Sequence, residues 1–416
     1  MNMKRRVVVT GLGTINAVGH NVEESWKAIR EGKNGIAPIT HFDTENFKVK
    51  MAGEVKDLTV ADYIDKKEAK KMDRFIQLGI IAANEAVKDS GLDTNAIDQT
   101  RFGVVVSSGI GGLGSIETNF EKGTKRGFDR VSPFFIPMTI SNLAAGHIAI
   151  MHHAKGLCTC PVTACAGGTN AIGDAFRNIR DGYQDVMIAG GCEASITRLG
   201  IGGFTSMKAL SESDDASRAS IPFDNERNGF VMGEGAGILI LEEYEHAKAR
   251  GAKIYAEMIG YGVSCDAHHI TAPAPEGEGG ARSMQNALND AHIKPEDVDY
   301  INAHGTSTHL NDLGETQAVK AVFKDHAYKL KMSSTKGNTG HCLGAAGGIE
   351  AVFSVKAIED HFVPPTINYK EKDPECDLDI VPNKGIEEDV HVAMSNSLGF
   401  GGHNATIIFK EIDHAA

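Results

Sequence analysis

Short runs of β-branched and aliphatic residues alternate along the chain with longer stretches in which apolar positions recur every three or four residues. The runs predict buried strands, and the longer stretches predict helices. The strand candidates are 7–10, 102–107, 186–189, 238–241, 255–260, 298–303, 331–334, 392–395 and 406–409. This alternation predicts an α/β fold built on a largely buried sheet.

The alternation occurs twice, which predicts an internal repeat. In each half a Gly-Phe loop leads into a strand: 229–236 into 237–241, and 399–405 into 406–409. Between the halves, 242–250 has the charges of a surface helix, and Gly251 follows it as a C-cap. We therefore expect two similar halves, 1–250 and 251–416, which pack tightly because no flexible linker separates them.

The chain has 416 residues, of which 41% are hydrophobic and 23% charged, as in an ordinary globular protein. Its 42 basic and 55 acidic residues give a formal net charge of 42 − 55 = −13. This acidic balance argues against nucleic acid as a partner, because a phosphate backbone is bound by positive surface. Glycine is abundant, with 47 residues, and many of these lie at strand ends, where the backbone must turn tightly.

Three observations bear on the compartment. The basic start of the chain is followed by only a short β-branched run, 7–10, which favours a first strand over a signal peptide. No apolar run approaches the ~18 residues that a membrane span needs. The seven cysteines are odd in number and lack disulfide-framework spacing. We expect a cytoplasmic protein with free thiols and no membrane association.

Cys165 lies in the sequence Thr-Ala-Cys-Ala-Gly-Gly, just before apolar positions at helical spacing in 172–179. The sequence therefore predicts Cys165 at a helix N-terminus. Unpaired amide hydrogens and the positive end of the helix dipole favour a thiolate there, and the small neighbours leave room for a substrate. This pattern fits an activated nucleophile, and it also fits a small buried thiol in a tight turn.

His304 follows the predicted strand 298–303 and opens a loop with three hydroxyl residues, 306–308. Ligands collect at the carboxyl ends of strands in α/β sheets, and hydroxyl groups offer hydrogen bonds to a polar substrate. We expect 312–315, Asp-Leu-Gly-Glu, to form the capping box of the next helix. A lone histidine at this position also fits a structural role.

The segment 333–350 again predicts a strand, a tight turn and a helix, and it holds His341 where the first half holds Cys165. If the halves face each other across a pseudo-twofold axis, both residues meet at helix N-termini and join His304 in one constellation. Lys336 and Glu350 could form a supporting ion pair. An ordinary surface pair of this kind would contribute little.

Two other motifs do not predict a cofactor. The one-residue spacing of Cys158 and Cys160 is too short for the common zinc knuckles. Gly11 and Gly13 follow the first strand, but the residues after them do not complete a dinucleotide-binding fingerprint. We expect neither a metal nor an organic cofactor.

Taken together, these motifs resemble the β-ketoacyl-[acyl-carrier-protein] synthases, the decarboxylating condensing enzymes of the thiolase superfamily, over essentially the whole chain. The segments that carry the resemblance are 163–166, 304–308, 336–347 and 399–404. They look like the family's nucleophile loop, first histidine motif, lysine and second histidine motif, and gating loop. One cysteine with two histidines is the set of the elongating types, and 225–235 with the chain length is most similar to type II.

The resemblance implies a thiolase-like fold of two similar halves, each with a mixed sheet, in the layers α-β-α-β-α. The N-terminal half, 1–250, would carry the nucleophile Cys165. The C-terminal half, 251–416, would carry both catalytic histidines and the gating loop.

The resemblance also implies the reaction, a decarboxylative Claisen condensation. Malonyl-[acyl-carrier-protein] would condense with an acyl chain held on Cys165, giving 3-oxoacyl-[acyl-carrier-protein] in fatty acid elongation. The amides of Cys165 and Phe400 would form the oxyanion hole for acyl transfer. His304 and His341 would both donate to the malonyl thioester oxygen as charge develops on it. Lys336 would be catalytic through the second histidine, with support from Glu350.

The family also implies substrate contacts. The pantetheine arm would lie along Thr306 and Thr308, Phe400 would gate the pocket, and Ile110 would line the acyl tunnel.

The implied partners are acyl- and malonyl-loaded acyl carrier protein and a second copy of the chain in a homodimer. Carrier proteins of this pathway are acidic, and the resemblance places the docking patch on Lys67, Lys70 and Lys71 at the pocket entrance. These lysines and Arg74 have spacings that put them on one face of a helix. A solvated helix end is the alternative interpretation of this cluster.

Other functions could use the same fold or the same residue types. A polyketide-type ketosynthase would need the same residues and stays an alternative. A non-condensing chain-length partner would share the fold, but such subunits usually lack the nucleophile that Cys165 supplies. A cysteine hydrolase would use a cysteine and a histidine, yet it would gain nothing from a second histidine.

Overall fold

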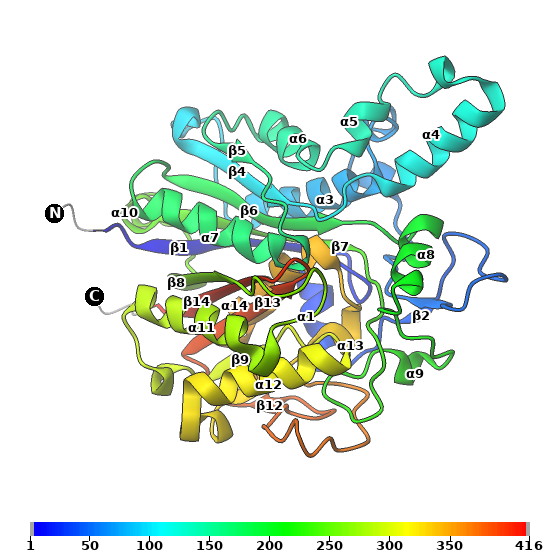
Figure 1. The fold of residues 1–416 in the computed structure, drawn as a ribbon. Helices are drawn as coiled ribbons and strands as arrows, with labels where there is room; N and C mark the ends of the chain where they lie inside the picture. The colour runs from blue at the N-terminus through cyan, green and yellow to red at the C-terminus, as the bar shows by residue number, and fades with distance from the viewer. Residues whose placement is uncertain (1–3, 413–416) are drawn as a thin grey trace.

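In the computed structural model of the chain, which describes residues 4–412, ten strands form one mixed sheet (Figure 1). Their order across the sheet is β10-β9-β13-β14-β8-β1-β7-β6-β4-β5. The strands are β1 (Val7–Ile15), β4 (Phe102–Ser107), β5 (Cys158–Thr159), β6 (Val186–Glu193), β7 (Gly235–Glu243), β8 (Ala256–Cys265), β9 (Tyr300–Asn302), β10 (Lys331–Ser333), β13 (Val392–Gly399) and β14 (His403–Lys410). Each strand predicted from the sequence overlaps one of these, so the α/β prediction is confirmed.

Each half of the described chain contributes five strands in the same arrangement, β1-β7-β6-β4-β5 in the first and β8-β14-β13-β9-β10 in the second. In both halves the first two neighbouring pairs are antiparallel and the last two are parallel. The topology therefore confirms the predicted repeat. The halves do not form separate sheets, however, because Val7 to Val9 of β1 also pair with Ala256 to Met258 of β8.

Helices cover the outer faces of the strands and fill the space between the halves (Figure 1). The outer helices are α3 (Arg74–Asp89) and α6 (Leu143–His152) on the N-terminal strands, with α11 (Glu278–Ala291) and α12 (His309–Phe323) on the C-terminal side. Between them lie α7 (Gly167–Arg180) and α14 (Ala346–Glu359), which contact strands of both halves. These are the expected α-β-α-β-α layers.

The residue pattern of β7 shows why the middle of a strand in this fold is apolar. Leu239 and Leu241 belong to the core around the two central helices, and Ile238 and Ile240 belong to the core under α3. Successive side chains of a strand point to opposite faces, so both sets are apolar where helices cover both faces of the strand. The two acidic residues of β7, Glu242 and Glu243, stand at its end.

The two central helices approach each other at their N-termini, where glycine is required. A side chain at Gly168 of α7 would place its Cβ 2.8 Å from the backbone nitrogen of Gly348 in α14. This contact brings the turn before each helix next to the other. The fold therefore places the segment of Cys165 beside the segment of His341.

The remaining elements are α1 (Val22–Arg30), α2 (Lys66–Ala69), α4 (Leu113–Arg126), α5 (Phe135–Thr139), α8 (Arg198–Ser206), α9 (Ala216–Ala219), α10 (Tyr244–Ala249), α13 (Lys336–Thr339), and the strands β2 (Ala37–Pro38), β3 (Met51–Ala52), β11 (Phe362–Val363) and β12 (Ile386–Glu387). The helix expected at 242–250 is shorter, because β7 continues to Glu243. The limits 1–250 and 251–416 stay a prediction. Among residues 4–412, no helix is both long and apolar enough to cross a membrane.

Candidate active site

Cys165 lies in a short 3-10 turn, Ala164–Ala166, that runs directly into α7. The backbone of Ala164 is left-handed, with φ of 50°, a conformation that costs energy for a residue with a side chain. The second half repeats this turn at Leu343–Ala345, where Leu343 has φ of 48° before α14. Cys165 is thus the counterpart of Gly344, and His341 lies three residues earlier.

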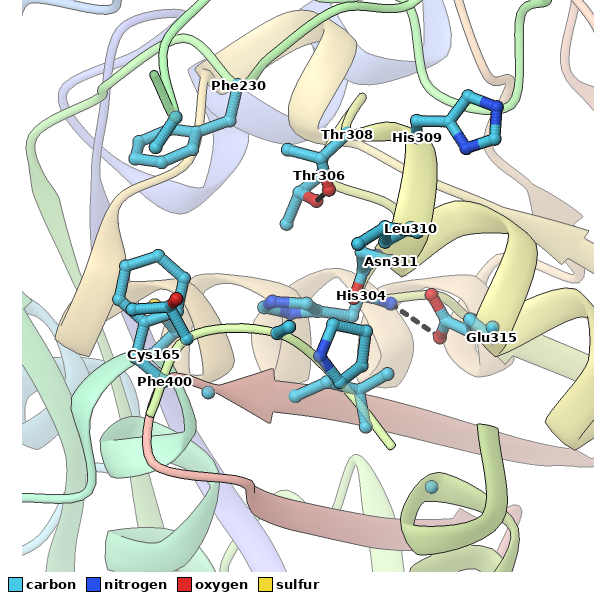
Figure 2. Close-up of a pocket in the computed structure, with 18 of the residues that line it drawn as sticks. Cys165, Phe230, His304, Thr306, Thr308, His309, Leu310, Asn311, Glu315 and Phe400 are labelled. Atoms are coloured by element: carbon cyan, nitrogen blue, oxygen red, sulfur yellow. Dashed lines mark hydrogen bonds between the residues drawn. The ribbon is translucent and has the colours of Figure 1, made fainter. Parts of the chain in front are cut away.

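One cavity of about 380 Å³ brings the predicted catalytic side chains together (Figure 2). Cys165 comes from the start of α7, His304 from the loop after β9, and His341 from the turn before α14. In Figure 2 the His304 ring points toward Cys165 and Phe400. Other lining residues are Phe204, Met207, Lys208, Asn228, Phe230, Asp266, Thr271, Thr306, Thr308, His309, Leu310, Asn311, Glu315, Leu398 and Asn404.

The sequence analysis expected the surroundings of Cys165 to favour the thiolate, but in the structure they favour the neutral thiol. Burial raises the pKa of the Cys165 thiol to about 12, and the carboxylate of Glu193 adds to the increase. The charge of Lys336 and the backbone N–H groups of Phe400 and Cys165 lower that pKa by less. The cost of burying a charge therefore outweighs the helix N-terminus.

The two histidines face each other closely. Their ring centroids are 5.1 Å apart and the rings are nearly perpendicular, at 89°. Burial, followed by the positive charge of Lys336, holds the pKa of both His304 and His341 well below the usual value of 6.5. Both rings are therefore neutral at neutral pH, and each can donate one N–H. Within residues 4–412, their Nδ1 atoms are buried without a hydrogen-bond partner.

The Lys336 ammonium and the Glu350 carboxylate form a buried ion pair, with side chains only 1% and 3% exposed. Burial raises the pKa of Glu350 to about 7, although Lys336 opposes this change. Neither residue lines the cavity. Lys336 therefore acts on the two histidines and the cysteine through its charge, from behind them.

Thr306 and Thr308 line the cavity on the loop between β9 and α12, and their hydroxyl oxygens are 2.9 Å apart in a hydrogen bond. Ser307 between them is left-handed, with φ of 69°. This loop thus presents two hydroxyl groups on one wall of the cavity, in a conformation that the surrounding structure must hold.

Phe400 closes another wall of the cavity, 6.3 Å from the ring of Phe204. The preceding Gly399 passes so close to the nucleophile turn that a Cβ there would lie 3.2 Å from the Cys165 nitrogen. Ile110 packs in the apolar cluster that contains Cys165 but does not line the cavity.

Two buried carboxylates that the sequence analysis did not assign to the site hold its backbone. Glu315 accepts hydrogen bonds from the backbone nitrogens of His304 and Gly305, both at 2.8 Å. Glu193 accepts from Gly109 at 2.7 Å and from Gly344 at 3.0 Å, and so joins the two halves. Neither set of contacts has a local sequence signal, because the groups that the two carboxylates bind come from other elements.

The expected capping box at 312–315 is wrong. The helix α12 begins earlier, at His309, so Asp312 and Glu315 lie inside it. Their carboxylates reach back to the loop instead: Asp312 accepts from the Ser307 nitrogen at 3.2 Å.

The expected basic helix face is also wrong. The helix α2 ends at Ala69, and a new helix begins at Arg74 with Asp73 as its N-cap. Arg74 is committed to a bidentate pair with the buried Glu234. Lys67 and Lys70 are exposed, whereas Lys71 pairs with Glu68 at 2.6 Å. None of the three lysines lines the cavity, and the basic residue that does is Lys208, which the sequence analysis missed.

Cys158 is exposed on β5 and Cys160 is half-buried after it. In the part of the chain from 4 to 412, no group of three or more histidine, cysteine, aspartate or glutamate residues is placed to hold a metal ion.

Comparisons of the sequence with known proteins agree on one family. Residues 4–247 match the family profile described as "Beta-ketoacyl synthase, N-terminal domain", and residues 255–370 match "Beta-ketoacyl synthase, C-terminal domain". The chain is 54% identical to a 3-oxoacyl-[acyl-carrier-protein] synthase 2 of Staphylococcus aureus (strain COL) over 99% of this chain and 100% of that protein. It is 53% identical to the protein of the same name from Synechocystis sp., over 98% of both chains.

Solved structures agree with the comparison of sequences. A ketosynthase of a type II polyketide system, bound to a hexaketide and in complex with its acyl-carrier protein, superposes with a TM-score of 0.91 at 38% identity, over 99% of this chain and 100% of that one. A β-ketoacyl synthase from Burkholderia phymatum STM815 superposes with a TM-score of 0.90 at 33% identity, over 98% and 100%.

Proposed function

Because the chain belongs to the β-ketoacyl synthase family, we propose that it catalyses the decarboxylative condensation of malonyl-[acyl-carrier-protein] with an enzyme-bound acyl chain. The product is 3-oxoacyl-[acyl-carrier-protein], and the pathway is fatty acid elongation. The observation that carries this proposal is the meeting of Cys165, His304 and His341 in one cavity. These are the groups that acyl transfer and enolate formation require.

The first half-reaction loads the acyl chain onto Cys165. The sulfur attacks the thioester carbonyl, a carbon–sulfur bond forms, and the carrier thiol leaves with the proton of Cys165. The N–H groups of Cys165 and Phe400, which already point at the thiol, donate to the oxygen of the tetrahedral intermediate. A neutral thiol suits this buried site until substrate arrives.

The second half-reaction generates the carbon nucleophile. Malonyl loses carbon dioxide, and the electron pair of the broken bond moves toward its thioester oxygen. His304 and His341 are neutral and adjacent, so both donate an N–H to that oxygen. The enolate carbon attacks the acyl group, and Cys165 leaves and regains a proton. Burial keeps the histidines neutral, and the positive charge of Lys336, which is paired with Glu350, adds to this effect.

The substrates reach the site on acyl carrier protein. The names of the curated relatives and one complex among the solved structures contain this partner. The pantetheine arm lies along the hydroxyls of Thr306 and Thr308, and Phe400 gates the cavity. Ile110 faces the acyl chain beyond the cavity, in the cluster around Cys165. The exposed Lys67 and Lys70, with Lys71, attract the acidic carrier.

We further propose a homodimer. The strand β5 stands at the end of the sheet order, so its outer edge can accept another strand. Helices α4, α5 and α6 lie on the same side of the molecule (Figure 1). They and the adjoining loop expose an unusual number of large apolar side chains: Phe120, Phe128, Ile136, Ile140, Ile150 and Met151.

A cytoplasmic location fits the seven free cysteines.

A polyketide ketosynthase is the second candidate, because a solved structure of that class superposes with a TM-score of 0.91 at 38% identity. The curated 3-oxoacyl-[acyl-carrier-protein] synthases are more similar, at 54% and 53%. The non-condensing partner is disfavoured by the intact Cys165.

Product analysis tests the proposal. The pure protein is incubated with acyl- and malonyl-carrier protein, and the carrier-bound products are weighed. We expect a 3-oxoacyl chain two carbons longer than the acyl donor, with one carbon dioxide released per product. Free fatty acid with no elongated product would support a hydrolase and contradict the proposal.

A further inference from the structure

The loop that carries Thr306 and Thr308 is strained and has to be held from outside. Gly305 and Ser307 have φ of 36° and 69°, both in the left-handed region. The Ser307 carbonyl accepts from the Gly229 nitrogen at 3.1 Å, and its hydroxyl accepts from the Ile221 nitrogen at 2.9 Å. The segment 221–229 thus packs under the loop.

Arg227 of this segment holds the end of the loop by hydrogen bonds. Its side chain is 1% exposed. Nε donates to the Thr308 carbonyl at 3.3 Å, and Nη2 donates to the His309 carbonyl at 3.1 Å. These carbonyls begin α12, so the guanidinium holds the point where the loop enters the helix. Arg227 does not line the cavity and cannot touch a substrate there.

Two carboxylates fix Arg227 in turn. Nη1 donates to Asp373 at 2.6 Å, and Asp312 lies 3.7 Å from Nε. Asp312 also accepts from Ser307, so it contacts both the arginine and the loop. The planar fork of an arginine reaches Asp373 on one side and the two carbonyls on the other at once, which an ammonium group cannot do.

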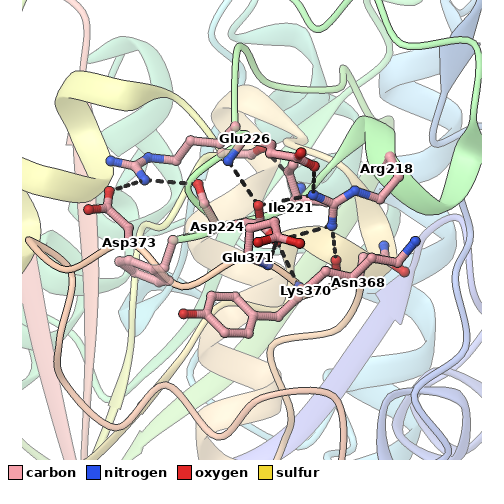
Figure 3. A network of polar contacts seen from close by, with 12 residues as sticks. Arg218, Ile221, Asp224, Glu226, Asn368, Lys370, Glu371 and Asp373 are labelled. Atoms are coloured by element: carbon pink, nitrogen blue, oxygen red, sulfur yellow. Dashed lines mark hydrogen bonds and ion pairs between the residues drawn. The ribbon is translucent and has the colours of Figure 1, made fainter.

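The neighbouring Arg218 provides a natural comparison (Figure 3). It binds the Asp224 carboxylate with both Nη atoms at 3.0 Å and the Asn368 carbonyl at 2.7 Å. Nη1 of Arg227 donates to the backbone carbonyl of the same Asp224 at 2.9 Å. The two arginines thus share one network, but only Arg227 also donates to the loop carbonyls of Thr308 and His309.

We propose that Arg227 is a positioning residue for the pantetheine arm: it holds Thr306 and Thr308 where their hydroxyls can bind the arm. This inference rests on the proposed function. It deepens that function by separating binding of the arm from the chemistry at Cys165 and the histidines, which Arg227 does not contact.

The test compares two malonyl thioesters as substrates, at a saturating concentration of the acyl donor. One is malonyl-pantetheine, and the other is a malonyl methyl thioester that lacks the amides of the arm. Losing hydrogen bonds from a charged donor predicts that Arg227→Lys raises KM for malonyl-pantetheine about 10-fold and changes kcat less than about twofold. The kcat/KM for the methyl thioester should stay within about twofold, because that substrate does not use the loop. Arg218→Lys, the matched control, should leave both the KM for malonyl-pantetheine and the kcat/KM for the methyl thioester unchanged.

A double-variant cycle shows whether Arg227 works through the loop. Thr308→Val alone should raise KM for malonyl-pantetheine, and adding it to Arg227→Lys should raise KM no further. Where Arg227→Lys does not fold, as judged by circular dichroism, Asp373→Asn loosens the same grip and should raise that KM about threefold.

Equal losses on both thioesters, or the same split in Arg218→Lys, would overturn the inference. A wild-type protein that forms no 3-oxoacyl product would instead overturn the proposed function, so the two failures are distinguishable.

Discussion

Cys165 combines a position that favours a thiolate with surroundings that oppose one. Because burial raises its pKa to about 12, the reactive thiolate is scarce at neutral pH. The rate of inactivation by iodoacetamide should therefore rise about tenfold per pH unit, from about pH 7 to about pH 9, without a plateau. Loss of condensing activity is the measurement, so that alkylation of the exposed Cys158 and Cys265 does not count. A plateau near neutral pH would show that the helix N-terminus prevails.

The amide of glutamine resembles an acylated cysteine in shape and polarity. We expect Cys165→Gln to abolish condensation and to retain release of carbon dioxide from malonyl-carrier protein, because the histidines still stabilise the enolate. Radiolabelled malonyl substrate measures both. Loss of decarboxylation in a folded variant would contradict the division of roles.

The two histidines are tested in that same background. His304→Ala or His341→Ala should lower the remaining decarboxylation ~10²-fold or more, the usual scale for losing a donor to an oxyanion. His292→Ala is the control, because His292 is exposed and outside the cavity. Unchanged carbon dioxide release in both alanine variants would disprove their role.

At the scale of elements, the short helix α2 and the turn that follows it are the candidate docking site for the carrier. Lys67→Glu with Lys70→Glu should raise KM for acyl-carrier protein and weaken its dependence on salt, because steering is lost. Acyl-pantetheine should be little affected. The control is Lys88→Glu with Lys294→Glu, which changes net charge equally at exposed lysines elsewhere. The prediction fails if the KM for acyl-pantetheine rises as much as the KM for acyl-carrier protein, or if the control variant raises the KM for acyl-carrier protein as much.

Periodicity predicted the strands and the central helix α7 well, because buried strands and amphipathic helices leave regular apolar patterns in the sequence. The other central helix, α14, is buried on nearly all sides, so its apolar residues do not form a single stripe. Helix ends and starts that leave no such pattern in the sequence were not predicted. The end of α2 at Ala69 depends on Asp73 capping a new helix, and Asp312 leaves its expected cap position because α12 begins at His309. Such boundaries depend on tertiary partners as well as on local spacing.

The candidate site followed from the sequence only in part. The segments of Cys165, His304 and His341 carry local signals. Glu193, Glu315 and Arg227 bind backbone groups of other elements, and no local pattern predicts those contacts. The pKa of Cys165 could not be predicted, since it depends on burial by side chains that are distant in sequence.

At the scale of the whole molecule, the exposed apolar helices predict a homodimer. Ile150 is 75% exposed on α6, which packs beside the edge strand β5. Light scattering should give twice the chain mass of 44.4 kDa for the wild type and a monomer for Ile150→Asp with Met151→Asp. Tyr328→Asp, at a large residue elsewhere that is 57% exposed, should stay dimeric. A monomeric wild type, or a dimer that survives the double variant, would refute this interface.

The central claim is that an acyl group held on Cys165 becomes the growing chain, and mass spectrometry tests it directly, with intact masses to follow the adduct and peptide mapping to locate it. The enzyme is first mixed with acyl-carrier protein and then chased with malonyl-carrier protein. We predict an acyl adduct on Cys165 that disappears at the rate at which the 3-oxoacyl product forms. An adduct on another residue, or product that forms while the Cys165 adduct persists, would contradict the claim.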